Sequence, residues 1–197
     1  MTLDSCKFFV INFKPGGEGF PHYIDKEYTP ELPTFNIHTA LPELTVFCDH
    51  YTLRTTVDNL AGDYYPLDDL ASDEMLSLCS ALSVDYFNVP LSIELSDGRE
   101  VSKHYNLFYL KKYLSIIDKD KSEYEIDDFI TDDETVYYSK INRFIIKENL
   151  CDHLFFCTDI GKPVCSSDFK ERFTKQGLVG IDFMAIDNNY KYDEWDN

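Results

Sequence analysis

Basic residues are scarce in this chain. Its 197 residues include 18 Lys and Arg against 36 Asp and Glu, which gives a formal net charge of -18. Proteins that bind nucleic acid neutralise phosphates with basic side chains, so this composition argues against a nucleic-acid ligand. The excess of acid predicts a basic protein partner instead.

Long apolar runs and paired cysteines are also missing. The apolar run Phe8–Phe13 is too short for a signal peptide or a membrane span, so no membrane association is expected. The six cysteines form no Cys-x-x-Cys pair, and a chain of this size folds without disulfides. We expect reduced, mostly buried thiols and a cytoplasmic protein.

The motifs of common enzymes and cofactor sites are absent as well. The glycine-rich segment 16–19 lacks the Lys-Ser/Thr that holds phosphate, and no Gly-x-Ser-x-Gly elbow occurs. Asp118, Asp120 and Ser122 resemble the start of a calcium loop, but its sixth and twelfth positions are Glu123 and Phe129.

A zinc site is equally poorly supported. His153, Cys157 and Cys165 have no zinc-ligand spacing and lie in an apolar, strand-like segment. The sequence therefore predicts no metal, no cofactor and no enzymatic activity. A small cytosolic enzyme or a regulatory binding domain, with a site assembled only by folding, stays open as the alternative.

Aromatic residues are plentiful, which distinguishes the chain from an acidic disordered one. It has 14 Tyr and 15 Phe and is 44% hydrophobic, enough for an ordinary core. We predict one domain spanning residues 1–197, or two packed lobes divided at about residue 65, 1–65 and 66–197.

Two helices have clear start signals. Ser72 is the N-cap of a helix predicted over 72–82, with Met75 and Cys79 on one face. Ser166 repeats that pattern before Phe169, and Gly177 ends the second helix.

Strands account for most of the remaining pattern. Residues 87–95 alternate between apolar and polar, and Asp97-Gly98 predicts a two-residue turn before an antiparallel return over 99–107. Residues 109–117 fit either a continuing strand or a short helix, and we favour a strand followed by a helical turn. Residues 161–163 fit a turn. Further strands are predicted at 7–13, 45–48, 136–138, 143–146, 154–157 and 180–186. The predicted fold class is α+β, with mixed, mainly antiparallel sheets and a few short helices packed on them.

Two stretches resemble a known family. Residues 109–124 look like an apolar strand that ends in Asp118, followed by a charged spacer, Ser122 and the aromatic Tyr124. Residues 166–183 look like its closing N-capped helix, glycine turn and strand. The family comprises immunity proteins of bacterial polymorphic and contact-dependent toxin systems, first catalogued as a domain of unknown function. Together with the helix and strand predicted over 72–95, these stretches extend the resemblance over roughly the C-terminal two thirds of the chain. Family members often have Asn at the position of Tyr109.

This resemblance implies a protein that binds and neutralises a cognate toxin, and the acidic charge favours a basic toxin such as a nuclease. Asp118, Ser122 and Tyr124 belong to the family motif and are assigned to the scaffold. Acids beside aromatic residues are favoured as the variable binding surface, because aromatic anchors ringed by charge are typical of interface hot spots. The candidate toxin-binding residues are Asp127, Asp128, Asp132, Asp133, Glu134, Tyr137, Tyr190, Tyr192 and Trp195, with Tyr138 in the same aromatic group.

Overall fold

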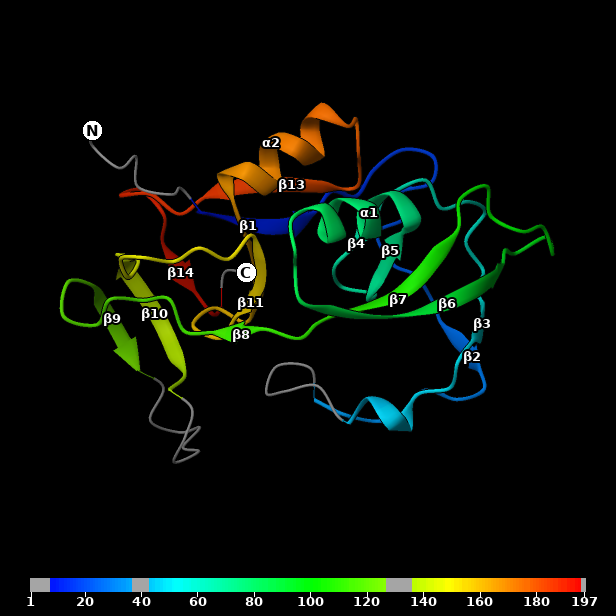
Figure 1. Cartoon of the computed structure of the whole chain (residues 1–197), viewed down its shortest axis with the longest axis horizontal. Helices are drawn as coiled ribbons and strands as arrows, with labels where there is room; N and C mark the ends of the chain where they lie inside the picture. The colour runs from blue at the N-terminus through cyan, green and yellow to red at the C-terminus, as the bar shows by residue number, and fades with distance from the viewer. Residues whose placement is uncertain (1–7, 37–42, 127–135, 196–197) are drawn as a thin grey trace.

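The computed structural model describes residues 8–36, 43–126 and 136–195. Within these ranges, two α-helices and fourteen strands form an α+β fold with mixed, mainly antiparallel sheets, as the sequence predicts (Figure 1). The strands form three sheets, in the orders β13-β1-β12-β11-β8, β2-β3-β6-β7-β5-β4 and β14-β10-β9.

The five-stranded sheet comprises β1 (Phe8–Phe13), β8 (Tyr113–Leu114), β11 (Leu154–Cys157), β12 (Lys162–Ser166) and β13 (Ile181–Ala185). The six-stranded sheet comprises β2 (Glu27–Thr29), β3 (Tyr51–Arg54), β4 (Tyr64–Tyr65), β5 (Leu70–Ser72), β6 (Tyr86–Glu94) and β7 (Tyr105–Leu110). The small sheet comprises β9 (Glu123–Ile126), β10 (Tyr138–Arg143) and β14 (Tyr192–Asp193).

The centre of the five-stranded sheet is buried on both faces, which explains the continuous apolar run Phe8–Ile11 in β1. Phe9 and Ile11 point into a core shared with both helices, whereas Phe8 and Val10 point into a core shared with the small sheet. Alternate side chains of a strand leave opposite faces, so a strand between two cores needs apolar residues at every position.

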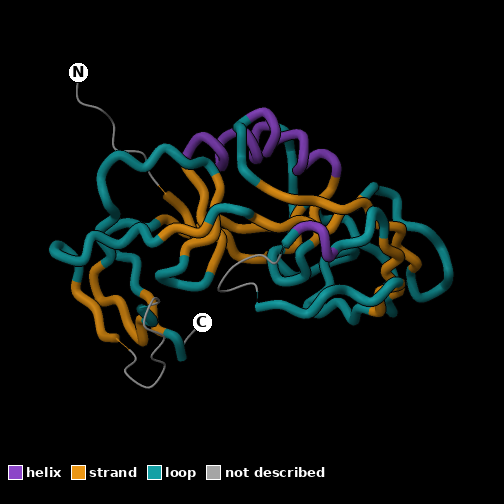
Figure 2. Tube along the Cα trace, turned by 60° about the horizontal axis from the view of Figure 1, so that its bottom comes forward, coloured by secondary structure: helices purple, strands orange, loops and turns teal. Residues whose placement is uncertain are grey.

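The two helices lie together on one side of the large sheets (Figure 2). They are α1 (Asp73–Ala81) and α2 (Ser167–Lys175). In each, the predicted N-cap hydroxyl accepts a backbone hydrogen bond, from Met75 N–H to Ser72 Oγ and from Phe169 N–H to Ser166 Oγ, both 3.2 Å. The sequence prediction of both helix starts is confirmed.

The antiparallel pairing of β6 and β7 forms as predicted, but β7 covers Tyr105–Leu110 in place of 99–107, with an isolated bridge between Glu94 and Glu100 before it. The loop is also longer than predicted. Leu95 N–H bonds to Arg99 O and Gly98 N–H to Leu95 O, so residues 96–98 form the loop. Gly98 has φ +79°, which is the left-handed position that follows a type I turn in a three-residue hairpin loop. The loop is therefore one residue longer than the predicted two-residue turn.

Two other predictions fail because tertiary contacts satisfy the backbone. Residues 44–46 form a 3-10 helix in place of the predicted strand at 45–48, and Phe47 packs on Phe87 and Tyr109. Residues 109–117 contain no helical turn, because Asp159 accepts the backbone N–H groups of Ile116 and Ile117. Short β8 instead pairs in parallel with β11.

Strand boundaries differ in two further places. The strands predicted at 136–138 and 143–146 are wrong in position, because the strand found here, β10, covers Tyr138–Arg143 between them. Its register shifts beside Lys140 and Arg143 disturb the apolar alternation. The turn predicted at 161–163 ends earlier, since Gly161 has φ +63° and β12 begins at Lys162. Pro163 is tolerated because β1 pairs with β12 only from Val164 onward.

Residues 1–65 contribute strands to both large sheets. β1 pairs with β12 and β13, while β4 pairs with β5 directly across the predicted lobe boundary at residue 65. The N-terminal third is thus interleaved with the rest of the chain in both sheets.

Candidate functional site

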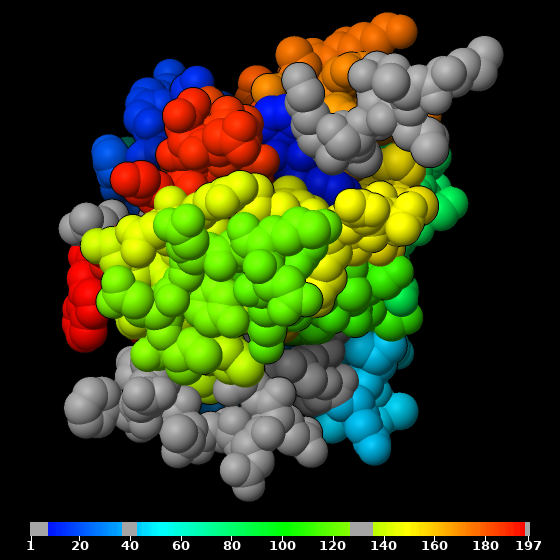
Figure 3. Space-filling view, turned by 90° about the vertical axis from the view of Figure 1, so that its left-hand side faces the viewer, coloured from blue at the N-terminus to red at the C-terminus, as the bar shows by residue number. Residues whose placement is uncertain are grey.

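The small sheet lies at one end of the molecule and presents its strands to solvent (Figure 3). β9 and β14 each pair only with β10, so both are edge strands. The inner side chains Tyr138 and Ile141 are buried in the core shared with the five-stranded sheet. The sheet is therefore a layer fixed from behind and open in front.

Acidic side chains outnumber basic ones on this sheet. Lys140 pairs with Asp193 at 3.2 Å, and Arg143 approaches Glu123 at 3.9 Å. Glu125 and Glu194 are exposed and form no ion pair with any residue in the described ranges. We call β9, β10 and β14 together with residues 194–195 the acidic sheet.

The predicted aromatic anchors lie at different depths. Trp195 is 85% exposed at the end of β14, and its backbone N–H donates to Asp193 at 3.1 Å. Tyr137 and Tyr192 are half-buried. Tyr190 is 7% exposed and packs edge-on against Phe144, so its ring belongs to the core and has little area left for a partner.

The predicted acidic part of the interface falls in a different part of the chain. Asp127, Asp128, Asp132, Asp133 and Glu134 lie outside the described residues. The structure places their flanks, Ile126 and Val136, next to the acidic sheet, and both side chains are exposed.

The three residues assigned to the scaffold make internal contacts. Ser122 Oγ accepts the Ile145 N–H at 3.0 Å, and Tyr124 packs edge-on against Tyr138. Lys121 lies 3.0 Å from Asp118, and their hydrogen bond holds the pKa of the Asp118 carboxyl below its usual range. This turn secures β9 to the body of the protein.

A pocket of about 580 Å³ lies between the two large sheets, and the sequence patterns gave no sign of it. Each sheet contributes a pair of touching aromatic rings to its lining. Tyr113 and Phe156 come from the five-stranded sheet with centroids 5.1 Å apart, and Tyr64 and Phe108 come from the six-stranded sheet with centroids 5.5 Å apart. We call this cavity the inter-sheet pocket.

Asp69 is an acidic residue in the lining of the inter-sheet pocket. It precedes β5, has the left-handed φ of +56° and forms no side-chain hydrogen bond or ion pair with any residue that the structure describes. Burial raises the pKa of its carboxyl to about 7. The nearby Asp68 raises this pKa further, whereas Lys26 lowers it. A residue with a left-handed backbone conformation and a carboxyl of shifted pKa in a pocket is a candidate functional residue.

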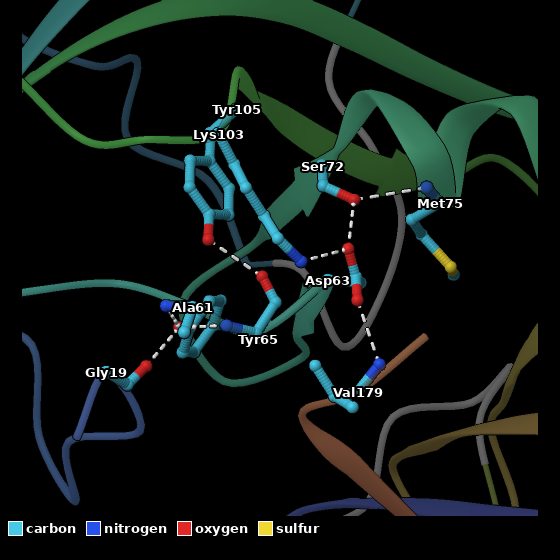
Figure 4. Close-up of polar contacts among 10 residues, drawn as sticks. Gly19, Ala61, Asp63, Tyr65, Ser72, Met75, Lys103, Tyr105 and Val179 are labelled. Atoms are coloured by element: carbon cyan, nitrogen blue, oxygen red, sulfur yellow. Dashed lines mark hydrogen bonds and ion pairs between the residues drawn. The ribbon is translucent and has the colours of Figure 1, made fainter. Parts of the chain in front are cut away.

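A second interior carboxylate, Asp63, has the opposite environment (Figure 4). It is 1% exposed and accepts hydrogen bonds from Ser72 Oγ at 2.8 Å, Lys103 Nζ at 2.6 Å and Val179 N–H at 2.8 Å. These partners come from the start of α1, the loop before β7 and the loop before β13. Asp63 therefore has a structural role in joining distant segments.

His153, Ser166 and Asp168 contain the residue types of a catalytic triad but lack its geometry. His153 Nδ1 lies 2.9 Å from Ser166 Oγ and 4.0 Å from Asp168, so a single ring nitrogen faces both groups. A triad uses the two nitrogens separately. Ser166 is also buried at 1% exposure and caps α2.

Metal ligands do not cluster in the parts of the chain that the structure describes. No group of three or more His, Cys, Asp or Glu side chains there could hold an ion. Cys157 and Cys165 are buried thiols, and burial raises the pKa of each. None of the described helices is long and apolar enough to cross a membrane.

Comparison with known proteins connects this architecture to a family. No curated protein matches the chain. The model of the immunity protein family, Imm11, matches residues 10–188, which include strands of all three sheets except β14 and reach well into the N-terminal third. The protein belongs to the Imm11 immunity protein family.

Proposed function

We propose that this protein neutralises a basic cognate toxin, such as a nuclease, by stoichiometric binding through the acidic sheet. Membership of an immunity protein family implies a non-enzymatic inhibitor and a toxin as partner. The observation that carries the assignment to the acidic sheet is Trp195, which is 85% exposed beside Asp193 and Glu194. A large exposed aromatic ring beside charge is a typical anchor of a protein interface.

The charge distribution supports an electrostatic contribution to binding. Glu125 and Glu194 leave an excess of negative charge on the acidic sheet after its two ion pairs are counted. The whole chain carries -18, so attraction to a basic partner extends beyond this one surface. Such attraction accelerates association more than it slows dissociation.

A nuclease fits this surface because its active site must attract phosphates. Carboxylates that occupy the same basic cleft would exclude nucleic acid from it. The two edge strands add a further means of contact, since an edge strand can pair with an extended segment of a partner.

Co-expression tests the function directly. The toxin-domain gene next to the gene of this protein should arrest growth when expressed alone, and co-expression of this protein should restore growth. A neighbouring gene that is harmless by itself would remove the main support for neutralisation.

Salt dependence tests the electrostatic part separately. The association rate of the purified pair, measured by stopped-flow fluorescence, should fall about tenfold or more as ionic strength rises from low to above physiological values. The dissociation rate should change much less. An association rate that is independent of salt would exclude a steering role for the acids.

A further inference from the structure

The inter-sheet pocket combines three features that are separate elsewhere in the described structure. It has a volume of about 580 Å³, aromatic walls from two sheets, and a carboxylate with no side-chain partner among the described residues. An empty apolar cavity would need no charge, and a structural carboxylate such as Asp63 is fully hydrogen-bonded. We therefore expect the carboxylate of Asp69 to find its hydrogen-bond partner in a ligand.

The chemistry of the lining selects a cation. An ionised carboxylate in a partly desolvated site gains most from a positively charged hydrogen-bond donor. The faces of the surrounding rings attract cations as well. Lys162 also lines the pocket, but no hydrogen bond or ion pair joins it to Asp69 in the described structure.

The aromatic lining further favours a guanidinium over an ammonium group. Guanidinium is planar, stacks on aromatic faces and donates two parallel hydrogen bonds to one carboxylate. An ammonium is a compact, strongly hydrated charge and gains less from stacking. The lining rings are Tyr64 and Phe108 from the six-stranded sheet, inclined at 81°, and Tyr113 and Phe156 from the five-stranded sheet, inclined at 42°.

We propose that the inter-sheet pocket receives an arginine side chain of the bound toxin, with its guanidinium on Asp69 and its flat faces against the aromatic walls. This proposal rests on the proposed function, because the toxin supplies the arginine. It adds a second point of contact, separate from the acidic sheet, at which one buried ion pair gives specificity.

The backbone at Asp69 fits this role. A left-handed φ of +56° is unfavourable for most residues, and Asp and Asn tolerate it best. The segment 66–69 connects the paired strands β4 and β5, and Leu67 beside it is 77% exposed at the lining of the pocket. The strand pairing holds the carboxylate in place, while the exposed residue offers apolar surface to the same partner.

The first experiment uses the full chain alone, so it does not depend on the toxin. Blocked arginine, N-acetyl-arginine methylamide, is titrated into the protein and followed by NMR at the aromatic resonances of the pocket. We expect saturable shifts with a dissociation constant on the order of 1 mM. The matching blocked citrulline has the same shape without the charge and should bind at least about tenfold more weakly.

Asp69→Asn is the matched variant, since Asn keeps the shape and tolerates the same φ. It should lower the affinity for blocked arginine to that of blocked citrulline. Equal binding of the two probes by the natural protein, undiminished arginine binding by the variant, or no saturable binding at all would each overturn the proposal.

The pH dependence of probe binding gives an independent check. Affinity should weaken as pH falls from about 8 to about 5, because protonation of Asp69 removes the charge. Asp68 and Lys26 also influence this carboxyl. The carboxylate in turn raises the pKa of the nearby phenols of Tyr28, Tyr64, Tyr109 and Tyr113. His22 and Lys162 line the pocket, so His22→Gln is included to remove the histidine titration. A pH dependence that survives in Asp69→Asn and disappears in His22→Gln would assign the effect to His22 and contradict the proposal.

The toxin complex separates this proposal from the proposed function. If Asp69→Asn loses probe binding and also weakens toxin neutralisation, the arginine comes from the toxin. If the variant loses probe binding but neutralises the toxin as well as the natural protein, the pocket is not part of the interface and the proposal fails while the function stands. If the probe binds but no toxin is neutralised, the proposed function fails and the toxin as source of the arginine fails with it.

Discussion

The acidic sheet and the inter-sheet pocket hold negative charge in contrasting ways. The acidic sheet carries several exposed carboxylates, some paired with Lys140 or Arg143 and all open to solvent screening. The pocket has one carboxylate, Asp69, enclosed by aromatic rings and with a pKa raised by burial to about 7. Many screened charges suit attraction at a distance, whereas a single desolvated charge suits recognition at contact.

Asp63 extends this comparison because it shows what a satisfied interior carboxylate looks like. Both Asp63 and Asp69 flank β4, and one has three hydrogen-bond donors where the other has no side-chain partner among the described residues. The protein therefore uses neighbouring aspartates for structure and, in our proposal, for recognition. Four substitutions test this division, from the largest expected effect to the smallest.

Asp63→Ala should produce the largest loss of stability. The change leaves Lys103 Nζ, Ser72 Oγ and Val179 N–H without their common acceptor. We expect the free energy of unfolding to fall by about 3 kcal/mol, measured by urea denaturation. Glu123→Ala on the acidic sheet is the control and should leave the urea midpoint nearly unchanged, because its pair with Arg143 is exposed. Similar losses for both variants would contradict the structural role of Asp63.

Trp195→Ala should produce the largest loss of binding. If the exposed ring is an anchor, its removal weakens the complex with the toxin by about 2 kcal/mol, or about thirtyfold in Kd, measured by isothermal titration calorimetry. Stability should not change, because the ring is 85% exposed. Tyr23→Ala, which removes another ring that is 77% exposed but lies between β1 and β2, should leave affinity unchanged. Equal effects of the two substitutions would remove the acidic sheet from the interface.

Asp69→Asn should stabilise the free protein above neutral pH. The pKa of Asp69 is raised from 3.8 to about 7 on folding, so the folded state binds this proton more tightly than the unfolded state does. The protonated Asp69 therefore contributes fully to the free energy of unfolding below about pH 4, and this contribution is lost as the pH rises to about 7. The variant should therefore gain a few kcal/mol at most at about pH 8 and little at about pH 4. Denaturation curves at the two pH values check the sign, and a gain that is the same at both would show that ionisation is not its cause.

Replacing Glu123, Glu125 and Glu194 together with Gln should have the smallest effect on the fold. All three are exposed, so the thermal midpoint should stay nearly constant. The association rate with the toxin at low salt should fall several-fold, because the local charge that attracts a basic partner is removed. Stopped-flow association of the natural and triple-variant proteins measures this, and identical rates would leave the rest of the chain to supply the attraction.

Local patterns predicted the elements whose signals lie within a few residues. Ser72 and Ser166 marked both helix starts, and the apolar alternation of 87–95 marked β6. The errors occur where a distant group decides the local structure. The N–H groups of Ile116 and Ile117 bond to the Asp159 carboxylate, which removes the predicted helical turn.

The candidate site was predictable only in part for the same reason. Acids beside aromatic residues directed attention to the C-terminal segment, and the structure places Trp195 on the surface there. Tyr190 shares that sequence context but lies in the core, because a neighbouring acid in the chain does not reveal on which side of a layer a ring packs. No sequence signal marked Asp69, although its environment is the more unusual one.

By itself, the sequence determined the acidic charge, the α+β class, the helix caps and the family resemblance. These properties depend on composition and on contacts between residues close in the chain. Only the tertiary structure decided which acidic side chains are exposed to solvent, which are hydrogen-bonded inside the protein, and which one lines a pocket. The lining of that pocket joins residues 11–22, 64–69, 108–113 and 156–163, which are brought together solely by sheet pairing and packing.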